Sequence, residues 1–286
     1  GKNEVVWVEN RLNAPLEVKK AFQFLHSDDP RTKRDGEGYL PSDQLYVFAP
    51  DSQKIMFKKA RRFTRSEMMV MDMLSTNEWK RPIYFAVTIG NDYHLGLDPY
   101  LELTGLAYRI TPERSADGRH RVNTEVMYDN MLHKFKYGNM NVPGIYIDEN
   151  TMRMCRTHRM MFMELAEALY NEGKHDKCLE VLDFAEEMLP GYNISYDYTS
   201  ATMAVYYYQL GEIEKANAIM TKVADNSVEY MAWGASLPKE QRASSQSTLQ
   251  QQLAILGYVL QNFERYQQKE LFNLYYDLYV QYASVR

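Results

Sequence analysis

The sequence predicts an α+β fold, in which a small mixed α/β sheet domain over residues 1–147 precedes an all-helical domain over residues 148–286. Three observations support this prediction. Short apolar runs compatible with strands occur in the first half and stop after it. The second half instead contains two helical hairpins that align on their glycine breaks, Gly173 and Gly211. The composition, 45% hydrophobic and 25% charged over 286 residues, is that of a globular chain long enough for two domains.

The elements at the N-terminus are short and mix two periodicities. Residues 15–26 carry apolar side chains at helical spacing. Residues 28–42 are rich in charge, Gly and Pro, which is typical of a loop. We expect short strands at residues 5–8 (VVWV), 45–48 and 55–57, the last two joined by a turn at Pro50-Asp51.

A capping box marks the next helix. Thr64 stands three residues before Glu67, so that a hydroxyl and a carboxylate can satisfy free backbone N–H groups at the helix start. Methionine, valine and leucine occupy most of residues 68–74. We therefore expect this helix to be buried on most sides and to end near Asn77.

The chain then returns to strand patterns. Pro82 can begin a strand but not lie inside a central one, and residues 83–89 form a near-continuous apolar run. Such a run predicts a strand covered on both faces. A further strand at residues 103–110 and a helix at residues 123–136 predict a small sheet with helices packed on it. The segment 137–148, which contains Gly and Pro, is the expected domain boundary.

The second half carries only helical patterns. When the breaks at Gly173 and Gly211 are aligned, small residues match small ones: Ala166 matches Ala204, and Cys178 matches Ala216. This spacing is the tetratricopeptide pattern, and it places Cys178 in the core. A degenerate third hairpin would cap the stack. The expected helices are residues 148–171, 174–189, 196–210, 212–226, 244–261 and 264–283.

Composition and motifs exclude several classes of function. The net charge of -5 gives no basic face for nucleic acid. The apolar runs are far shorter than the roughly 20 residues of a membrane span, so we expect none in this chain. The two cysteines, Cys155 and Cys178, form neither a disulfide framework nor a metal site. Because no nucleophile–base spacing, phosphate loop or metal motif occurs, we assign no catalytic residue, no metal ligand and no cofactor.

One polar loop is a candidate ligand site. It directly follows the apolar run 83–89, and ligands often bind beyond the ends of strands. The alternative is that these side chains cap the following helix and orient the loop, which we consider the stronger interpretation. The residues of this polar loop are Arg81, Asp92, His94 and Asp98.

The repeat register also predicts a concave helical face. It mixes Met, Tyr and Asn side chains and would suit a protein or peptide partner. The alternative is that this face docks on the first domain or on the third hairpin. The residues of the predicted face are Met160, Met163, Glu167, Tyr170, Asn171, Tyr198, Val205 and Tyr208. Separately, Arg153, Arg156 and Arg159 share one side of a helix, where a solvated face is the simplest interpretation.

Three stretches of the chain are distinctive together. They read TRSEMMVMDMLSTNEWKRPIYFAVTIGNDYHLGLDPYLELTGLAYRITP from Thr64, RVNTEVMYDNMLHKFKYG from Arg121, and IYIDENTMRMCRTHRMMFMELAEALYNEGK from Ile145. Over roughly residues 64–224 the sequence resembles the extramembrane C-terminal region of bacterial protein O-mannosyltransferase-like membrane proteins. The resemblance implies a parent with many membrane helices, in the inner membrane of a Gram-negative bacterium, with this region in the periplasm. It also implies that the catalytic acidic residue lies outside this chain.

These observations lead to one expected function and two alternatives. We expect a non-catalytic accessory domain of a membrane glycosyltransferase, which positions a protein acceptor or partner and adjoins its own membrane domain. The first alternative is a cell-envelope interaction scaffold without a role in glycosylation. The second is a carbohydrate-binding module, in which Tyr and Trp rings would stack on sugars.

Overall fold

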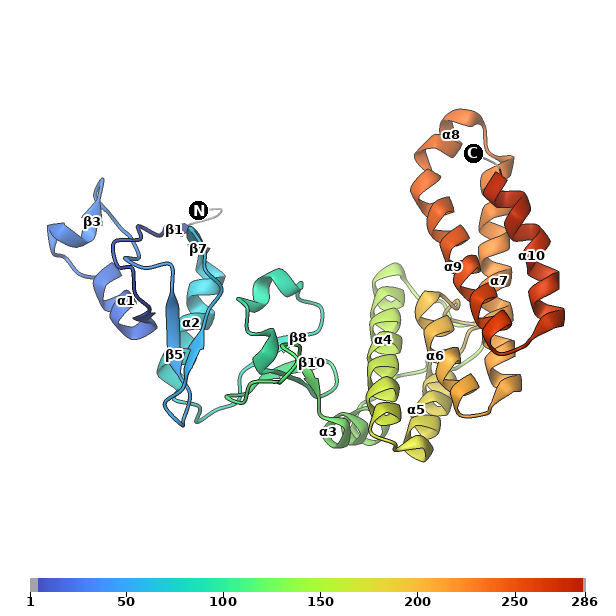
Figure 1. The fold of residues 1–286 in the computed structure, drawn as a ribbon, viewed down its shortest axis with the longest axis horizontal. Helices are drawn as coiled ribbons and strands as arrows, with labels where there is room; N and C mark the ends of the chain where they lie inside the picture. Colours follow the sequence, from blue (N-terminus) through green and yellow to red (C-terminus); the bar gives the residue numbers. More distant parts are fainter. Residues whose placement is uncertain (1–4, 285–286) are drawn as a thin grey trace. The chain divides into compact units, whose positions relative to one another are not determined.

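The computed structural model describes residues 5–284 and confirms the predicted α+β class. Its strands lie in the first part of the chain and long helices fill the second (Figure 1). The chain divides into two compact units between Met127 and Tyr128, whereas the sequence predicted a boundary at residue 147. The reason is that the intervening segment packs on the helices that follow it. The ring of Tyr137 lies 5.8 Å from that of Phe162 and 5.7 Å from that of Phe184.

The first unit begins with small sheets and two helices. The predicted strands at its N-terminus are present, and the expected loop 28–42 contains a short hairpin. Strand β1 (Val5–Trp7) pairs antiparallel with β7 (Arg62–Thr64), and β3 (Lys33–Arg34) pairs with β4 (Glu37–Gly38). A three-stranded sheet has the order β2-β5-β6, formed by Leu16–Glu17, Leu45–Phe48 and Lys54–Met56. The helices are α1 (Val18–Leu25) and α2 (Arg65–Asn77).

Helix α2 has the predicted start but not the predicted burial. Thr64 and Glu67 form the capping box. Only one face is buried, at Met71 and Leu74, because the helix packs on α1, β5 and β7 from one side. Met69, on another face, is 59% exposed. The expectation of a helix buried on most sides was therefore wrong.

A second sheet follows α2 and has the order β11-β9-β10-β8. The run 83–89 was expected to form a long strand covered on both faces, and this was wrong. Only Tyr84–Ala86 form a strand, at the edge of the sheet, with Phe85 buried and Tyr84 exposed. The expected strand 103–110 is instead a hairpin that turns at Gly105. Its strands are β9 (Leu101–Leu103) and β10 (Ala107–Ile110), and β11 is Arg121–Val122.

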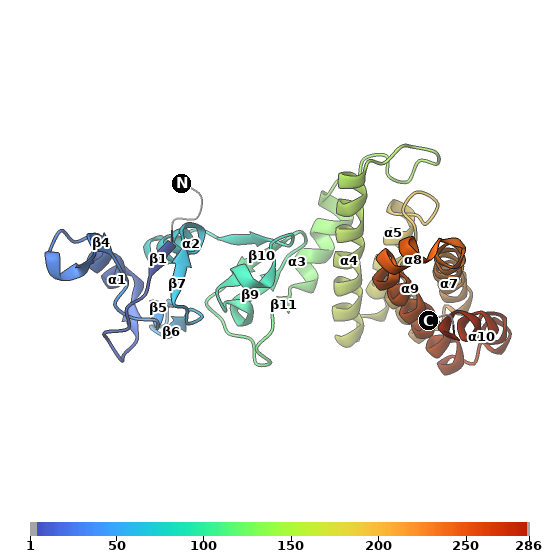
Figure 2. The ribbon, with the colours of Figure 1, turned by 90° about the horizontal axis from the view of Figure 1, so that it is seen from above.

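The second unit is helical within the described residues. The division between the units falls within α3 (Thr124–Asp129), which continues as a π-helical turn, Asn130–Lys134. The helices then pack in consecutive pairs, α4 with α5, α6 with α7, and α9 with α10 (Figures 1 and 2). Their bounds are Glu149–Asn171, His175–Met188, Tyr198–Gln209, Ile213–Ser236, Lys239–Ser244 (α8), Gln246–Arg265 and Lys269–Ser284.

Glycines end the first helix of two of these pairs, as the sequence predicts. Gly173 and Gly211 have φ angles of 74° and 85°, a left-handed conformation that glycine adopts without steric cost. The small residues Ala166 and Ala204 are fully buried beside these turns, where helices approach closely. Helix α7 runs ten residues beyond its expected end at residue 226, to Ser236, and packs extensively on α9.

Candidate functional site

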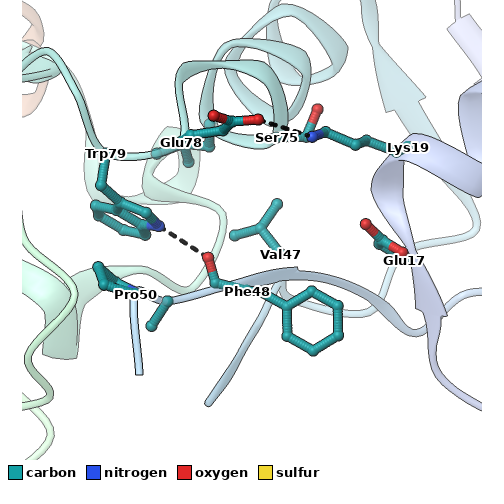
Figure 3. Close-up of a pocket in the computed structure, with 10 residues that line it drawn as sticks. Glu17, Lys19, Val47, Phe48, Pro50, Ser75, Glu78 and Trp79 are labelled. Atoms are coloured by element: carbon teal, nitrogen blue, oxygen red, sulfur yellow. Dashed lines mark hydrogen bonds and ion pairs between the residues drawn. The ribbon is translucent and has the colours of Figure 1, made fainter. Parts of the chain in front are cut away.

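A cavity of about 220 Å³ lies in the first unit, beside the turn that follows α2 (Figure 3). Val47 of strand β5 and Leu74 of helix α2 contribute buried apolar side chains to its lining. The charged groups Glu17, Lys19 and Glu78 and the indole of Trp79 stand around it. We call this site the Trp79 cavity.

The turn that carries Trp79 has an unusual backbone. Glu78 and Trp79 have φ angles of 49° and 60°, so two consecutive residues other than glycine adopt a left-handed conformation. Such residues cost of order 1 kcal/mol each and persist only where their surroundings hold them. Here Asn77 Oδ1 accepts a hydrogen bond from the backbone N–H of Arg81 at 3.1 Å, and Asn77 Nδ2 donates to the backbone carbonyl of Arg81 at 2.5 Å. Lys80 N–H also donates to the Asn77 carbonyl at 3.0 Å.

The indole of Trp79 ties this turn to the sheet. Its Nε1–H donates to the carbonyl of Phe48 at 2.8 Å, across 31 residues of sequence. Phe48 is the last residue of β5, and its exposed side chain lies against Tyr46, with ring centroids 5.2 Å apart. Because the only polar atom of the indole is occupied, the remaining ring surface of Trp79 is apolar.

The charges around the Trp79 cavity belong to two ion-paired groups, one around Glu78 and one around Glu17. The Glu78 carboxylate lies 2.8 Å from the ammonium of Lys80 and 3.8 Å from that of Lys19. The hydrogen bond from Lys80, followed by the charges of Lys80 and Lys19, lowers the pKa of Glu78. The Glu17 carboxylate stands on the opposite side of the cavity from Trp79 (Figure 3) and lies 3.9 Å from Lys20.

The structure brings together two of the four residues predicted for the polar loop. His94 is 2% exposed, and its Nδ1 lies 2.8 Å from the Asp98 carboxylate. The imidazole stacks on Phe85 at 5.2 Å between ring centroids. Asp92 is exposed in the short 3-10 helix Asn91–His94, and the exposed Arg81 is held through its backbone by the turn after α2. Asp98 thus orients a core histidine, and the side chains of this loop make no cap at the 3-10 helix Asp98–Tyr100.

One family model matches this part of the chain. Residues 48–130 match the domain described as TMEM260-associated domain 2. No curated protein and no solved structure matches the chain. The matched segment contains Trp79 and the second sheet, and it also contains the His94–Asp98 pair. Among residues 5–284 no helix is long and apolar enough to cross a membrane, and no group of three or more His, Cys, Asp or Glu is placed to hold a metal ion.

The predicted helical face in the second unit is partly filled by the third hairpin. Tyr208 is 4% exposed, stacks on Tyr266 at 4.3 Å between ring centroids, and donates to Asn217 Oδ1 at 2.5 Å. The ring centroid of Tyr198 lies 5.0 Å from that of Tyr258 of α9, yet Tyr198 remains 50% exposed. Of the other residues predicted for this face, three are half-buried, namely Met163, Tyr170 and Val205, and three are exposed, namely Met160, Glu167 and Asn171.

Arg159 is the residue that sequence reasoning placed wrongly. It was expected on a solvated face with Arg153 and Arg156, but it is 1% exposed. Its guanidinium donates to the carbonyls of Leu189 and Ile194, both at 2.8 Å, and to that of Ser195 at 3.0 Å. A signal was available, because Arg159 precedes the core residues Phe162 and Ala166 by three and seven positions on the same helix.

Two half-buried polar side chains lie beside this arginine. The Arg159 guanidinium lies 5.4 Å from the centre of the Tyr196 ring, and the Tyr196 hydroxyl donates to the Glu186 carboxylate. Burial raises the pKa of Glu186, although the Tyr196 hydrogen bond and the charge of Arg159 oppose the shift. These contacts join helices α4 and α5 to the loop that leads into α6. They hold the segment between α5 and α6 against helix α4.

Proposed function

We propose that this chain is a non-catalytic accessory region of a membrane glycosyltransferase, in which the helical unit positions a protein acceptor or partner. One observation carries the proposal: residues 48–130 match TMEM260-associated domain 2. TMEM260 is a predicted O-mannosyltransferase-like protein. The proposal adds that the parent holds the catalytic residue in its membrane domain and that this region lies on the periplasmic side of the inner membrane of a Gram-negative bacterium.

The half-exposed helical face supports a role in binding protein. We interpret the helix pairs as tetratricopeptide-like, since buried alanines occur at matching positions beside Gly173 and Gly211. On this interpretation the exposed side chains of Met160 and Tyr198 line the open part of the face. Tyrosine offers contact area at low entropic cost, and methionine adapts to varied shapes. Tyr208 is buried and stacks on Tyr266, so it is not available to a partner.

A carbohydrate-binding module is the second candidate, and the Trp79 cavity favours it. Its lining joins an aromatic ring and apolar side chains to a few polar groups, which is the composition usual for small-molecule sites. The two candidates are compatible, since the cavity lies in the first unit and the helical face in the second. A scaffold without a role in glycosylation is the competing proposal that the following experiment addresses.

The test uses the full parent protein in its own membrane. Deletion of the region should abolish glycosylation of the acceptor, measured by mass spectrometry, while membrane insertion of the parent is unchanged. Met160→Ala with Tyr198→Ala should reduce glycosylation, because both side chains are exposed and neither change opens the core. Tyr230→Ala is the matched control, since this tyrosine is equally exposed but lies on α7. Full glycosylation after deletion refutes the proposal and favours the scaffold.

A further inference from the structure

We propose that the Trp79 cavity binds a single sugar ring. This inference deepens the proposed function by assigning a ligand class to the first unit, and it rests on that function only for its biological purpose.

The size of the cavity favours a ligand of one ring. Its volume of about 220 Å³ is below the range of roughly 300–1,000 Å³ that is usual for drug-sized ligands. Val47 and Leu74 give it an apolar lining, and both are held in the core. A sugar ring has a face of C–H groups that can lie against such a surface. A peptide or a longer lipid chain would extend far beyond it.

The charges around the cavity favour a neutral ligand with many hydroxyl groups. The Glu17 carboxylate stands on one side, and the paired Lys19 and Glu78 stand on another (Figure 3). A phosphate or carboxylate ligand would meet the Glu17 carboxylate, whereas a cationic ligand would meet the Lys19 ammonium. Hydroxyl groups can donate to the carboxylates and accept from the ammonium, so a polyol satisfies both signs of charge at once.

Trp79 is held in a fixed position before any ligand binds. Its indole N–H donates to the carbonyl of Phe48 at 2.8 Å, and its backbone is kept in a left-handed conformation by the Asn77 contacts. A strained backbone held in this way is a recurrent feature of binding sites. Because the indole N–H is occupied, the ring can offer only apolar surface, which suits the C–H face of a sugar. A rigid ring also loses little conformational freedom on binding.

The chain allows Trp79 to be observed alone. It has three tryptophans, Trp7, Trp79 and Trp233, so the double variant Trp7→Phe/Trp233→Phe leaves Trp79 as the single indole fluorophore. This variant of the full chain is titrated with D-mannose, D-glucose, D-galactose and N-acetyl-D-glucosamine, each measured separately. We expect a saturable change in Trp79 emission with at least one sugar, with a Kd of about 1 mM, as is usual for weak binding of one small ligand.

A matched pair of variants identifies the site. Glu17→Gln, made in the same background, should weaken binding about tenfold, because it removes charge-assisted hydrogen bonds from the hydroxyl groups. Glu17 makes no side-chain hydrogen bond at the start of α1, and its 3.9 Å contact with the exposed Lys20 is worth little, so the change should cost the fold little. Glu37→Gln changes an exposed carboxylate that does not line the cavity and should leave the Kd unchanged.

Two results would overturn the inference: no saturable change with any of the four sugars, or equal binding by the Glu17→Gln variant and its parent. Its failure is separable from failure of the proposed function. If no sugar binds but deletion of the region abolishes glycosylation, the inference fails and the accessory role stands. If a sugar binds in a Glu17-dependent way while the deletion leaves glycosylation intact, the cavity is confirmed and the accessory role fails.

Discussion

Replacement of Arg159 by methionine should destabilise the helical unit strongly. The two side chains have similar length, so methionine keeps much of the packing but none of the hydrogen bonds. Three backbone carbonyls in the segment that leads from α5 to α6 lose their donor, those of Leu189, Ile194 and Ser195. The carbonyls of Leu189 and Ile194 have little access to water, because both residues are buried, whereas Ser195 is exposed.

The expected cost follows from two opposing effects. A buried acceptor left without a partner costs about 1–3 kcal/mol. Against this, the variant no longer buries a charge, and burial is the main cause that lowers the pKa of Arg159. Glu186 becomes less stable as an anion, since the positive charge of Arg159 helps to keep it ionised. We expect a net loss of about 3 kcal/mol in the free energy of unfolding, within the range for breaking buried polar contacts.

The assay is urea unfolding of the full chain, followed by far-UV circular dichroism. Arg156→Met is the matched control, because Arg156 is exposed one turn earlier on the same helix and should change stability by less than about 0.5 kcal/mol. Arg159→Lys should fall between the two, since one ammonium cannot reproduce the planar guanidinium fork. If Arg159→Met is as stable as Arg156→Met, the carbonyls do not need this donor and the reasoning is refuted.

Three further predictions concern the same unit. Burial raises the pKa of Glu186 in the folded state, so stability should fall as the pH rises from the free-glutamate value of about 4.3 through the folded pKa. Tm measured against pH should show a smaller fall in Glu186→Gln than in the original protein. Identical profiles for the two proteins would contradict this prediction. Gly173→Ala should cost about 1 kcal/mol in urea unfolding from backbone conformation alone, because an added Cβ meets no atom within 4 Å; unchanged stability would argue against a strained turn. Burial raises the pKa of Cys178 to about 12 and also raises that of Cys155. Neither thiol should therefore react with iodoacetamide at neutral pH before the chain unfolds. Alkylation of either cysteine in the native chain, detected by mass spectrometry, would disprove this prediction.

Sequence patterns over a few residues predicted helix starts and the turns that end helices. The capping box at Thr64 and the glycine turns at Gly173 and Gly211 depend on residues within a few positions of each other, and all three are present. The burial of residues 83–89 could not be predicted in this way. An apolar run does not reveal whether its strand lies inside a sheet or at its edge, and the edge position leaves Tyr84 exposed. Sheet order depends on pairing between distant segments.

The candidate site was harder to predict for the same reason. The polar loop was visible in sequence, and its His94–Asp98 pair lies four positions apart. The Trp79 cavity needs strand β5, and its decisive hydrogen bond joins Trp79 to Phe48 across 31 positions. Nothing within the stretch around Trp79 indicates that partner. The left-handed backbone of Glu78 and Trp79 points to a binding site only once the acceptor of the Trp79 N–H is known.

The two units solve one physical problem in a similar way. Carbonyl groups in loops and at the ends of strands lie outside the regular hydrogen-bond ladders, and a side chain from a distant segment can supply their donor. Trp79 supplies one to Phe48, and Arg159 supplies three to the segment after α5. Asn193 likewise donates to the carbonyls of Met140 and Val142, at 2.8 and 2.7 Å.

Such long-range donors have a consequence for binding. They tie loops to neighbouring elements, so that aromatic rings beside them keep a defined position. Tyr192, next to Asn193, donates its hydroxyl to the Asn141 carbonyl at 2.6 Å and is still 64% exposed. Trp79 is held in the same manner. A ring fixed before contact gives up little entropy when a ligand covers it, so the proposed binding at Trp79 depends on the donors as well as on the ring.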